Sequence, residues 1–293
     1  MASPGTSAPR IPDTVRGILW MVLAMLAGTG MEATGKVLVL DYPVVQVVWA
    51  RLAFHSACLA PLIGPRLPSL FVTQRLGLHL LRSSTQVTAL GLFFAAVVFI
   101  PLADASAIHL VSPLFVVALA SPVLGESVGL RTWIGVVAGF LGALIIIRPG
   151  MGAMHWAAIL PVGSALSAAV LQVTTRKLSQ TEGTLTILVY TSLVGLVVYS
   201  LAVPFVWVAP DLAGWALMIL MGCLGFCSNF AQIKAFQAAP AAVASPFIYT
   251  GLVWATGYGF VLFGDLPDRW TVLGMMTIAA SGIYILRQER RRS

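Results

Sequence analysis

The sequence has very little charge. Only 9% of its 293 residues are charged, whereas a soluble domain carries about 25%. Hydrophobic residues make up 59%, so polar side chains are too few to cover a large soluble core. The apolar residues come in long runs, and 157–171 and 213–231 contain no charged residue. Runs of about 18 or more apolar residues predict membrane-spanning helices, because lipid offers backbone groups no hydrogen-bond partner.

Several classes of function lack their sequence signatures. Cys58, Cys223 and Cys227 all fall in apolar runs without the spacing and histidine partners of a zinc site, so we interpret them as helix-packing residues and expect no metal and no cofactor. No G-x-x-x-x-G-K-[ST] motif is present, which argues against ATP as the energy source. The net charge of +7 does not predict nucleic-acid binding, since basic residues in such a composition mark cytoplasmic loops.

Breaks at proline, glycine and charge clusters predict ten spanning helices. The expected ranges are 17–38, 44–63, 78–99, 101–122, 131–148, 155–175, 184–206, 213–236, 241–262 and 270–287. Residues 1–16 and 288–293 are then short cytoplasmic tails. The fold class expected is an all-α membrane protein without a soluble domain.

Basic residues predict the orientation of these helices. With the N-terminus in the cytoplasm, the inside segments hold Arg10, Arg16, Arg66, Arg75, Arg82, Arg131, Arg176, Lys177, Arg287, Arg290, Arg291 and Arg292, and the outside segments hold only Lys36, Arg148 and Arg269. Cytoplasmic loops of membrane proteins carry this excess of lysine and arginine. Both termini are therefore expected in the cytoplasm, which requires an even number of spans.

The chain repeats itself. PLADAS at 101–106 and PAAVAS at 240–245 are 139 residues apart, and the same offset aligns the third to fifth spans with the eighth to tenth. An offset of 140 joins the first two spans to the sixth and seventh. Residues 17–148 and 155–287 are therefore expected to be two five-helix repeats. Because five is odd, the second repeat must be inverted, as in many alternating-access transporters. The alternative is a duplication kept only for packing.

These motifs resemble a known family. PLADAS, then SPLF at 112–115, LGE at 124–126 and IIIRPG at 145–150, are similar to the EamA unit of the drug/metabolite transporter superfamily. The resemblance implies two inverted halves around a central cavity, and export or exchange of small metabolites across the bacterial inner membrane. Aromatic amino-acid exporters are the nearest members we would suggest. Carriers of S-adenosylmethionine, riboflavin or other metabolites share the motifs and remain the alternative.

Three charged residues fall inside the first two spans. Glu32 and Lys36 lie one turn apart, and Arg51 lies at a similar depth on the second span. Charges inside a bilayer cost a few kcal/mol each, so they face a cavity or a partner. A Glu32–Arg51 or Glu32–Lys36 pair is expected. It is either a binding or gating cluster or a structural ion pair.

Two polar stripes mark the expected cavity. On the third span His79, Ser83 and Gln86 share one helix face, and the offset of 139 carries that face to Asn229 and Gln232. We interpret the stripes as a polar cavity floor or inner gate, with interhelical hydrogen bonding as the alternative.

Aromatic and proline residues give further candidates. Trp254 lies near the middle of a span with Tyr258 on the same face, so it either lines a cavity for an aromatic substrate or fills the bundle core. Pro113 and Pro246 lie within their helices and are candidates for kinks used in gating.

The function predicted from these observations is secondary transport of a small metabolite by alternating access. Amino-acid export, with aromatic amino acids as the example, is the main hypothesis. The alternatives are a carrier for S-adenosylmethionine, riboflavin or a nucleoside, and more remotely a channel. A membrane enzyme is disfavoured because Glu32 is the one acid deep in a predicted span. We expect the protein to function as a monomer.

Overall fold

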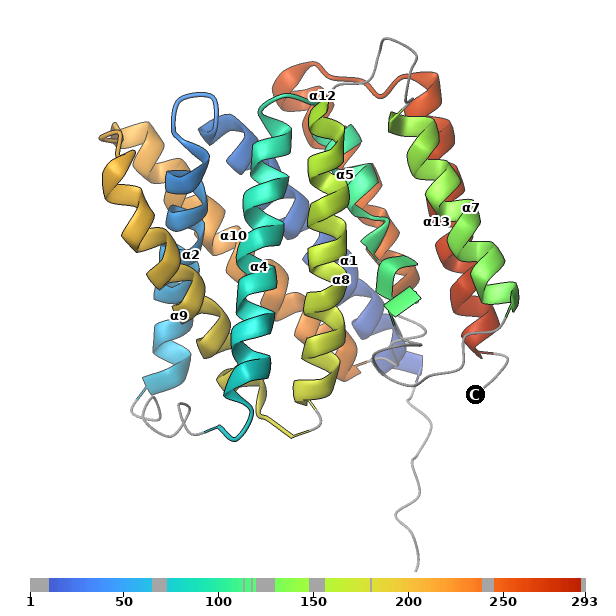
Figure 1. The fold of residues 1–293 in the computed structure, drawn as a ribbon, viewed down its shortest axis with the longest axis horizontal. Coiled ribbons are helices and arrows are strands. Elements are labelled where there is room, and N and C mark those ends of the chain that lie inside the picture. The colour runs from blue at the N-terminus through green and yellow to red at the C-terminus, as the bar shows by residue number, and fades with distance from the viewer. Residues whose placement is uncertain are drawn as a thin grey trace, which may run out of the picture.

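A computed structural model describes residues 11–64, 73–112, 114–116, 118–119, 130–147, 156–179, 181–238 and 245–290. Within these ranges every regular element is an α-helix or a short 3₁₀ helix, and none is a strand. The helices stand side by side as a bundle (Figure 1). The expected all-α class is therefore confirmed for the part of the chain described.

The first half of the chain begins with two helices joined by a tight turn. These are α1 (Ile11–Leu38) and α2 (Val44–Ile63), and the N–H groups of Leu40 and Asp41 close the turn on carbonyls of α1. The remaining helices of this half are α4 (Leu76–Val97), α5 (Leu102–His109) and α7 (Leu130–Ile147). Pro43 and Pro101 precede α2 and α5. Proline has no backbone N–H, but at the start of a helix this group would have no acceptor within the helix, so its absence costs little.

The second half repeats this order. It contains the 3₁₀ helix η2 (Trp156–Ala158), α8 (Ile159–Ser179), α9 (Thr184–Ala202), the 3₁₀ helix η3 (Val203–Phe205), α10 (Leu212–Ala238), the 3₁₀ helix η4 (Ser245–Tyr249), α12 (Thr250–Phe263) and α13 (Arg269–Arg290). Helix α12 ends at Gly264, whose φ of 71° is the left-handed conformation that glycine adopts without strain.

Some helices begin or end away from the boundaries expected for their spans. Helix α1 begins at Ile11, inside the expected tail 1–16, because a proline at position 12 is tolerated in a first helical turn. Helix α13 continues to Arg290, inside the expected tail 288–293, since polar residues can extend a helix beyond the lipid. The expected span 101–122 is interrupted, because α5 ends at His109.

Six of the described helices are long and apolar enough to cross a membrane. They are Val15–Leu38, Val44–Ile63, Leu76–Val97, Trp156–Thr175, Leu185–Phe205 and Leu212–Gln232, and three shorter apolar helices accompany them. Large apolar side chains such as Leu201, Phe205 and Val261 are exposed on the outside of the bundle. This surface suits lipid and not water. The count of ten crossings stays a prediction.

The packing of the helices follows the sequence repeat. Helix α1 packs on α10 and on α12, and the corresponding α8 packs on α4 and on α5. Likewise α2 packs on α10 as α9 packs on α4. The pairs α2 with α9, α5 with α12 and α7 with α13 join equivalent helices. In Figure 1 α1 rises towards the α1–α2 turn while α8 descends, so corresponding helices run in opposite directions.

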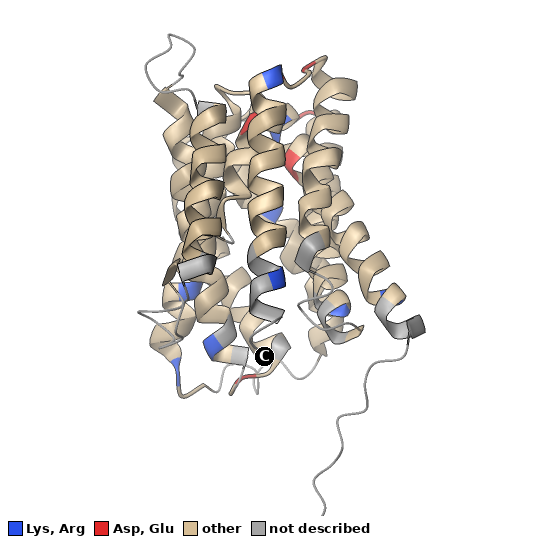
Figure 2. Ribbon diagram, turned by 90° about the vertical axis from the view of Figure 1, so that its right-hand side faces the viewer, with Lys and Arg blue, Asp and Glu red and all other residues tan. Residues whose placement is uncertain are grey.

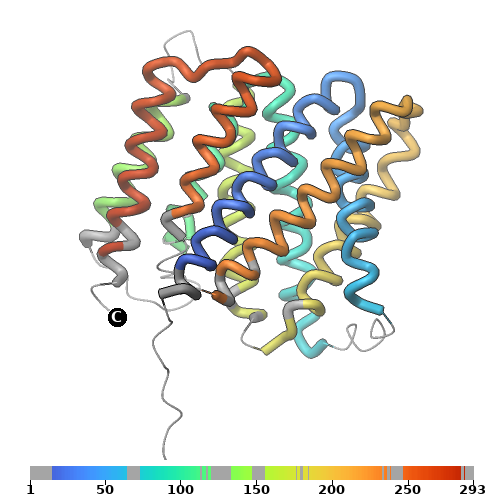
Figure 3. Tube along the Cα trace, turned by 180° about the vertical axis from the view of Figure 1, so that it is seen from behind, coloured from blue at the N-terminus to red at the C-terminus, as the bar shows by residue number. Residues whose placement is uncertain are grey.

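The two helices that close the bundle on one side approach each other through glycines. A Cβ on Gly274 of α13 would lie 2.6 Å from the carbonyl oxygen of Gly142, and one on Gly142 of α7 would lie 3.0 Å from the oxygen of Gly274. Small residues allow such backbone contact between membrane helices. Figure 3 shows α13 lying along the outer edge of the bundle, away from α2 and α9.

We name the ends by their position in Figure 1. The upper end holds the α1–α2 turn and residues 264–268, and the lower end holds the α8–α9 turn. Helix α1 starts and α13 finishes at the lower end (Figures 1 and 3). Lysine and arginine gather towards the lower end and most acidic residues towards the upper end (Figure 2).

Hydrogen bonds join the two halves at both ends. At the upper end the Gln46 side chain pairs with the backbone of Val208, at 2.7 and 2.9 Å, and Lys36 forms an ion pair with Asp265 at 3.0 Å. At the lower end Thr73 donates to Glu182 at 2.6 Å. The two halves are therefore in contact at both ends of this interface.

Candidate functional site

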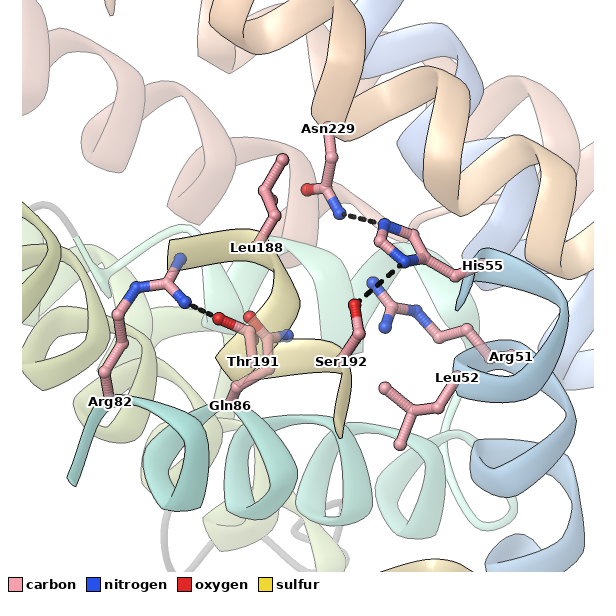
Figure 4. A pocket seen from close by; sticks show the side chains of 9 residues that line it. All are labelled: Arg51, Leu52, His55, Arg82, Gln86, Leu188, Thr191, Ser192 and Asn229. Atoms are coloured by element: carbon pink, nitrogen blue, oxygen red, sulfur yellow. Dashed lines mark hydrogen bonds between the residues drawn. The ribbon is translucent and has the colours of Figure 1, made fainter. Parts of the chain in front are cut away.

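A small cavity lies where α2, α4, α9 and α10 meet, so both halves of the chain contribute to it (Figure 4). Its volume is about 40 Å³, room for about three water molecules. The lining residues are Arg51, Leu52, His55, Arg82, Gln86, Leu188, Thr191, Ser192 and Asn229. Most of these residues are polar. Polar side chains within membrane-spanning helices cost free energy, so they indicate a functional site.

His55 of α2, in the first half, lies on the α10 side of the cavity and is held by two residues of the second half. Asn229 approaches its Nε2 at 3.1 Å through the amide nitrogen, and Ser192 approaches its Nδ1 at 3.4 Å. Because the amide nitrogen can only donate, Nε2 accepts and Nδ1–H points at the serine hydroxyl. The arrangement fixes a neutral imidazole in one orientation.

Two arginines enter the cavity from α2 and α4. The Nε of Arg82 donates to Thr175 at 2.7 Å, and one terminal nitrogen donates to Thr191. The Nε of Arg51 lies 3.0 Å from the sulfur of Met31. The side chains are 8% and 7% exposed. Both charges are therefore enclosed, although within the described part of the chain their hydrogen-bond acceptors are two threonine hydroxyls and one thioether.

Some polar residues predicted from sequence do reach this cavity. Gln86 of α4, Asn229 of α10 and Arg51 of α2 line it. His79 and Ser83 do not. The His79 ring stacks on Tyr190 with centroids 4.4 Å apart and lies 4.0 Å from Glu182, and the Ser83 hydroxyl bonds the carbonyls of His79 and Tyr190.

Three other candidates lie away from the cavity lining. Gln232 is half-buried on α10, one turn below Asn229. Trp254 of α12 has a buried indole N–H without a hydrogen-bond partner among the described residues. The hydroxyl of Tyr258 faces Gly30 of α1. Neither Trp254 nor Tyr258 lines the cavity that contains Arg51 and Arg82.

The structure gives Lys36 and Glu32 direct partners outside the charged cluster. Lys36 pairs with Asp265, and its ammonium lies 4.4 Å from the centre of the Phe263 ring. Glu32 accepts from Ser106 at 3.1 Å. Glu32 and Arg51 interact electrostatically, yet no N–O distance between them is within 4.0 Å. Partners from the second half and from α5, far away in sequence, replaced the local ones.

The kink candidates are placed only in part. Pro113 lies outside the described residues, and the described chain turns at Leu110–Val111 just before it. Pro246 falls in η4, so the segment before α12 is a 3₁₀ helix. Neither observation tests a role in gating.

Sequence reasoning missed His55, Arg82, Thr191 and Ser192. The signal for His55 was present, because it follows Arg51 by four residues and shares its helix face. The position of Thr191 was also accessible, as it corresponds to Arg51 under the offset of 140. Arg82 was assigned to a cytoplasmic segment by its closeness to the end of its span. Among the described residues, no three His, Cys, Asp or Glu side chains form a metal-binding group.

Two inverted halves around a polar cavity define a class of membrane carriers for small molecules. The model of the EamA-like transporter family matches residues 15–148 and again 155–287. The chain therefore belongs to the EamA-like transporter family, and it is a small-molecule transporter of the drug/metabolite transporter superfamily.

Curated relatives match over almost the whole chain. A riboflavin transporter of Rhizobium johnstonii is 33% identical over 95% of this chain and 93% of its own length. An S-adenosylmethionine uptake transporter of Rickettsia bellii is 26% identical, with 94% of both chains covered. A pseudopaline exporter of Pseudomonas aeruginosa is 28% identical over 94% of this chain and 97% of its own.

A solved crystal structure has the same fold. It superposes with a TM-score of 0.64 over 97% of this chain and 99% of its own, at 14% identity. That likeness concerns the fold alone. The names of the relatives point to S-adenosylmethionine, riboflavin and pseudopaline, and do not support the suggested resemblance to aromatic amino-acid exporters.

Proposed function

We propose that this protein is a secondary transporter that carries a metabolite of vitamin or nucleoside size, such as riboflavin or S-adenosylmethionine, by alternating access. One observation carries the proposal: the cavity lined by Arg51, His55, Arg82 and Asn229 lies between the halves of an inverted repeat. Such a position lets each half open the site to one side of the membrane. The relatives favour this substrate range over amino-acid export.

The cavity has to enlarge to hold such a substrate. At about 40 Å³ it is far below the 300–1,000 Å³ of ligand pockets. The contacts that join the halves at each end are the ones that must break. Opening the upper end separates Gln46 from Val208 and Lys36 from Asp265, and opening the lower end separates Thr73 from Glu182. Alternating access breaks one set while the other holds.

The charge distribution supports a cytoplasmic lower end in a bacterial inner membrane. Arg16 near the start of α1, Arg75 just before α4 and Lys177 near the end of α8 are at the lower end, and Asp41 after α1 and Asp211 before α10 are at the upper end. Figure 2 shows the same separation of basic and acidic residues. Positive residues favour the cytoplasmic side. Both termini would then be cytoplasmic.

Transport by purified protein in liposomes tests the function. Labelled riboflavin, S-adenosylmethionine, phenylalanine and tryptophan are offered outside, with and without unlabelled compound inside. We expect saturable uptake of riboflavin or S-adenosylmethionine that internal substrate accelerates, which separates a carrier from a channel. Saturable exchange of phenylalanine or tryptophan, without uptake of riboflavin or S-adenosylmethionine, would contradict the proposed substrate range and support amino-acid export.

A further inference from the structure

We propose that Arg51 and Arg82 together form an anion-binding subsite that holds a carboxylate or phosphate group of the transported molecule. The inference rests on the proposed function and adds the charge of the substrate to it. Both guanidinium groups face the same cavity, Arg51 from α2 and Arg82 from α4, on either side of Thr191 and Ser192 of α9 (Figure 4).

The charge of the cavity is unbalanced. None of the described residues that line it is aspartate or glutamate, while two are arginines. Arg82 has no acidic partner within ion-pair distance among the described residues, since Glu182 lies against His79 and Thr73. Glu32 acts on Arg51 only beyond 4.0 Å, and its own acceptor capacity is partly used by Ser106. Buried cations are expected to have a paired anion.

Hydrogen-bond donors are also left over. A guanidinium has five N–H groups, and each arginine uses few of them. Among the described residues, neither terminal nitrogen of Arg51 has a hydrogen-bond acceptor, and only one terminal nitrogen of Arg82 has one. These nitrogens belong to side chains that line the cavity. A planar two-oxygen anion satisfies such donors in pairs.

The neutral residues around the arginines suit an anion as well. Ser192, Gln86 and Asn229 supply further hydroxyl and amide groups to the same space. His55 is held neutral between Ser192 and Asn229. It therefore adds no third positive charge to the cavity, and an anion would interact with the two arginines. The cavity has room for a carboxylate, while the rest of the substrate occupies space that opens during transport.

The test compares probes that differ by one anionic group. S-adenosylmethionine is paired with decarboxylated S-adenosylmethionine, phenylalanine with phenethylamine, and riboflavin 5′-phosphate with riboflavin. Binding to the purified full-length protein is measured by calorimetry, and transport by liposome uptake. We expect the wild-type protein to bind the anionic member of a pair about 10- to 100-fold more tightly, the range of hydrogen bonds to charged groups. The first two pairs report a carboxylate site and the third a phosphate site.

Two variants locate the preference. R51M and R82M should each reduce it at least tenfold with little effect on the neutral probe, and R51K should restore part of it. R269M is the matched control, because Arg269 is an exposed arginine at the upper end. The wild-type comparison needs no variant, so it decides even if R51M or R82M fails to fold.

The outcomes separate the two proposals. Transport of a neutral probe as good as that of its anionic partner would overturn the subsite and leave the transport function intact. An anionic preference that survives both substitutions would overturn the assignment to these arginines. Failure of every carboxylate and phosphate probe to bind the folded protein would overturn the subsite, and absence of uptake of every probe would overturn the proposed substrate range.

Discussion

In the first half of the chain α2 and α4 carry Arg51 and Arg82 into the cavity, whereas the corresponding positions of the second half carry Thr191 and Met221. Four other buried or half-buried ionisable residues of the first half follow the same rule, whereas Lys36 corresponds to the basic Arg176. Under the offsets of 140 and 139, the correspondences are Glu32 with Gln172, His55 with Gly195, His79 with Met218 and His109 with Ile248. The packing of the halves is repeated, but the charge is not.

This difference separates what the duplication supplies from what the site requires. Corresponding helices pack in corresponding pairs, which provides two similar gates. A substrate, however, has no twofold symmetry, and four arginines around one cavity would repel one another. The first half therefore holds the charge, while Thr191 and Ser192 of the second half offer neutral hydroxyls to it.

The largest effect is expected from moving an arginine between the halves. R51T should lower uptake of an anionic substrate about 10- to 100-fold through loss of a charged hydrogen bond. The double variant R51T/T191R should not recover, because an arginine at 191 removes the acceptor of Arg82 and faces its positive charge. Uptake rates in liposomes, with elution profiles to verify folding, provide the measurement. Recovery in the double variant would show that the halves are interchangeable in chemistry as well as packing.

Substitution of either glycine at the contact between α7 and α13 should destabilise the protein, whether Gly142 of the first half or Gly274 of the second is replaced. In G274A the new Cβ lies 2.6 Å from a backbone oxygen, and in G142A 3.0 Å, so α7 and α13 must separate. Overpacking of this kind costs about 1–3 kcal/mol. The apparent melting temperature in detergent should fall in both, further for G274A, and should not fall in G257A, where a Cβ has nothing within 4 Å. Equal melting of G274A and wild type would mean that α7 and α13 do not pack as described.

Glu32 is the acidic residue of the first half that interacts with Arg51, and its removal tests whether the positive charge of this half binds the anion. E32Q gives the first half the residue found at the corresponding position 172 and leaves the Ser106 contact an acceptor oxygen. Removing a carboxylate that attracts Arg51 and repels an anion should tighten binding of an anionic probe several-fold. Calorimetry on the purified protein measures this. Weaker binding would show that Glu32 contacts the substrate itself.

The sequence was sufficient for the elements whose causes are local. Apolar runs and the proline and glycine breaks predicted the helices near their observed positions, and the offset of 139 aligned positions that the structure packs in equivalent pairs. Gln86 and Asn229 were found because helix periodicity selects a face.

The remaining site depended on contacts between distant segments. Lys36 lies one turn from Glu32, and that proximity suggested a pair, but Asp265 is 229 residues further along the chain and still forms the ion pair. His79 resembled a cavity residue by its face, yet the Tyr190 ring covers it. Periodicity predicts that a side chain points inward. It does not predict which helix lies opposite.

The smallest effect is expected at the upper end, where Lys36 and Asp265 tie α1 of the first half to the loop before α13 of the second. The side chains are 10% and 35% exposed, and such a pair contributes about 0.2–1 kcal/mol. Melting of K36M, D265N and the double variant gives the coupling as the difference between the double effect and the two single ones. We expect it below about 1 kcal/mol, with K36M alone costing more than D265N because Lys36 also loses the Phe263 ring. A pair this weak can break in every transport cycle. A coupling of several kcal/mol would make the tie permanent, and the upper end would then not be one of the gates.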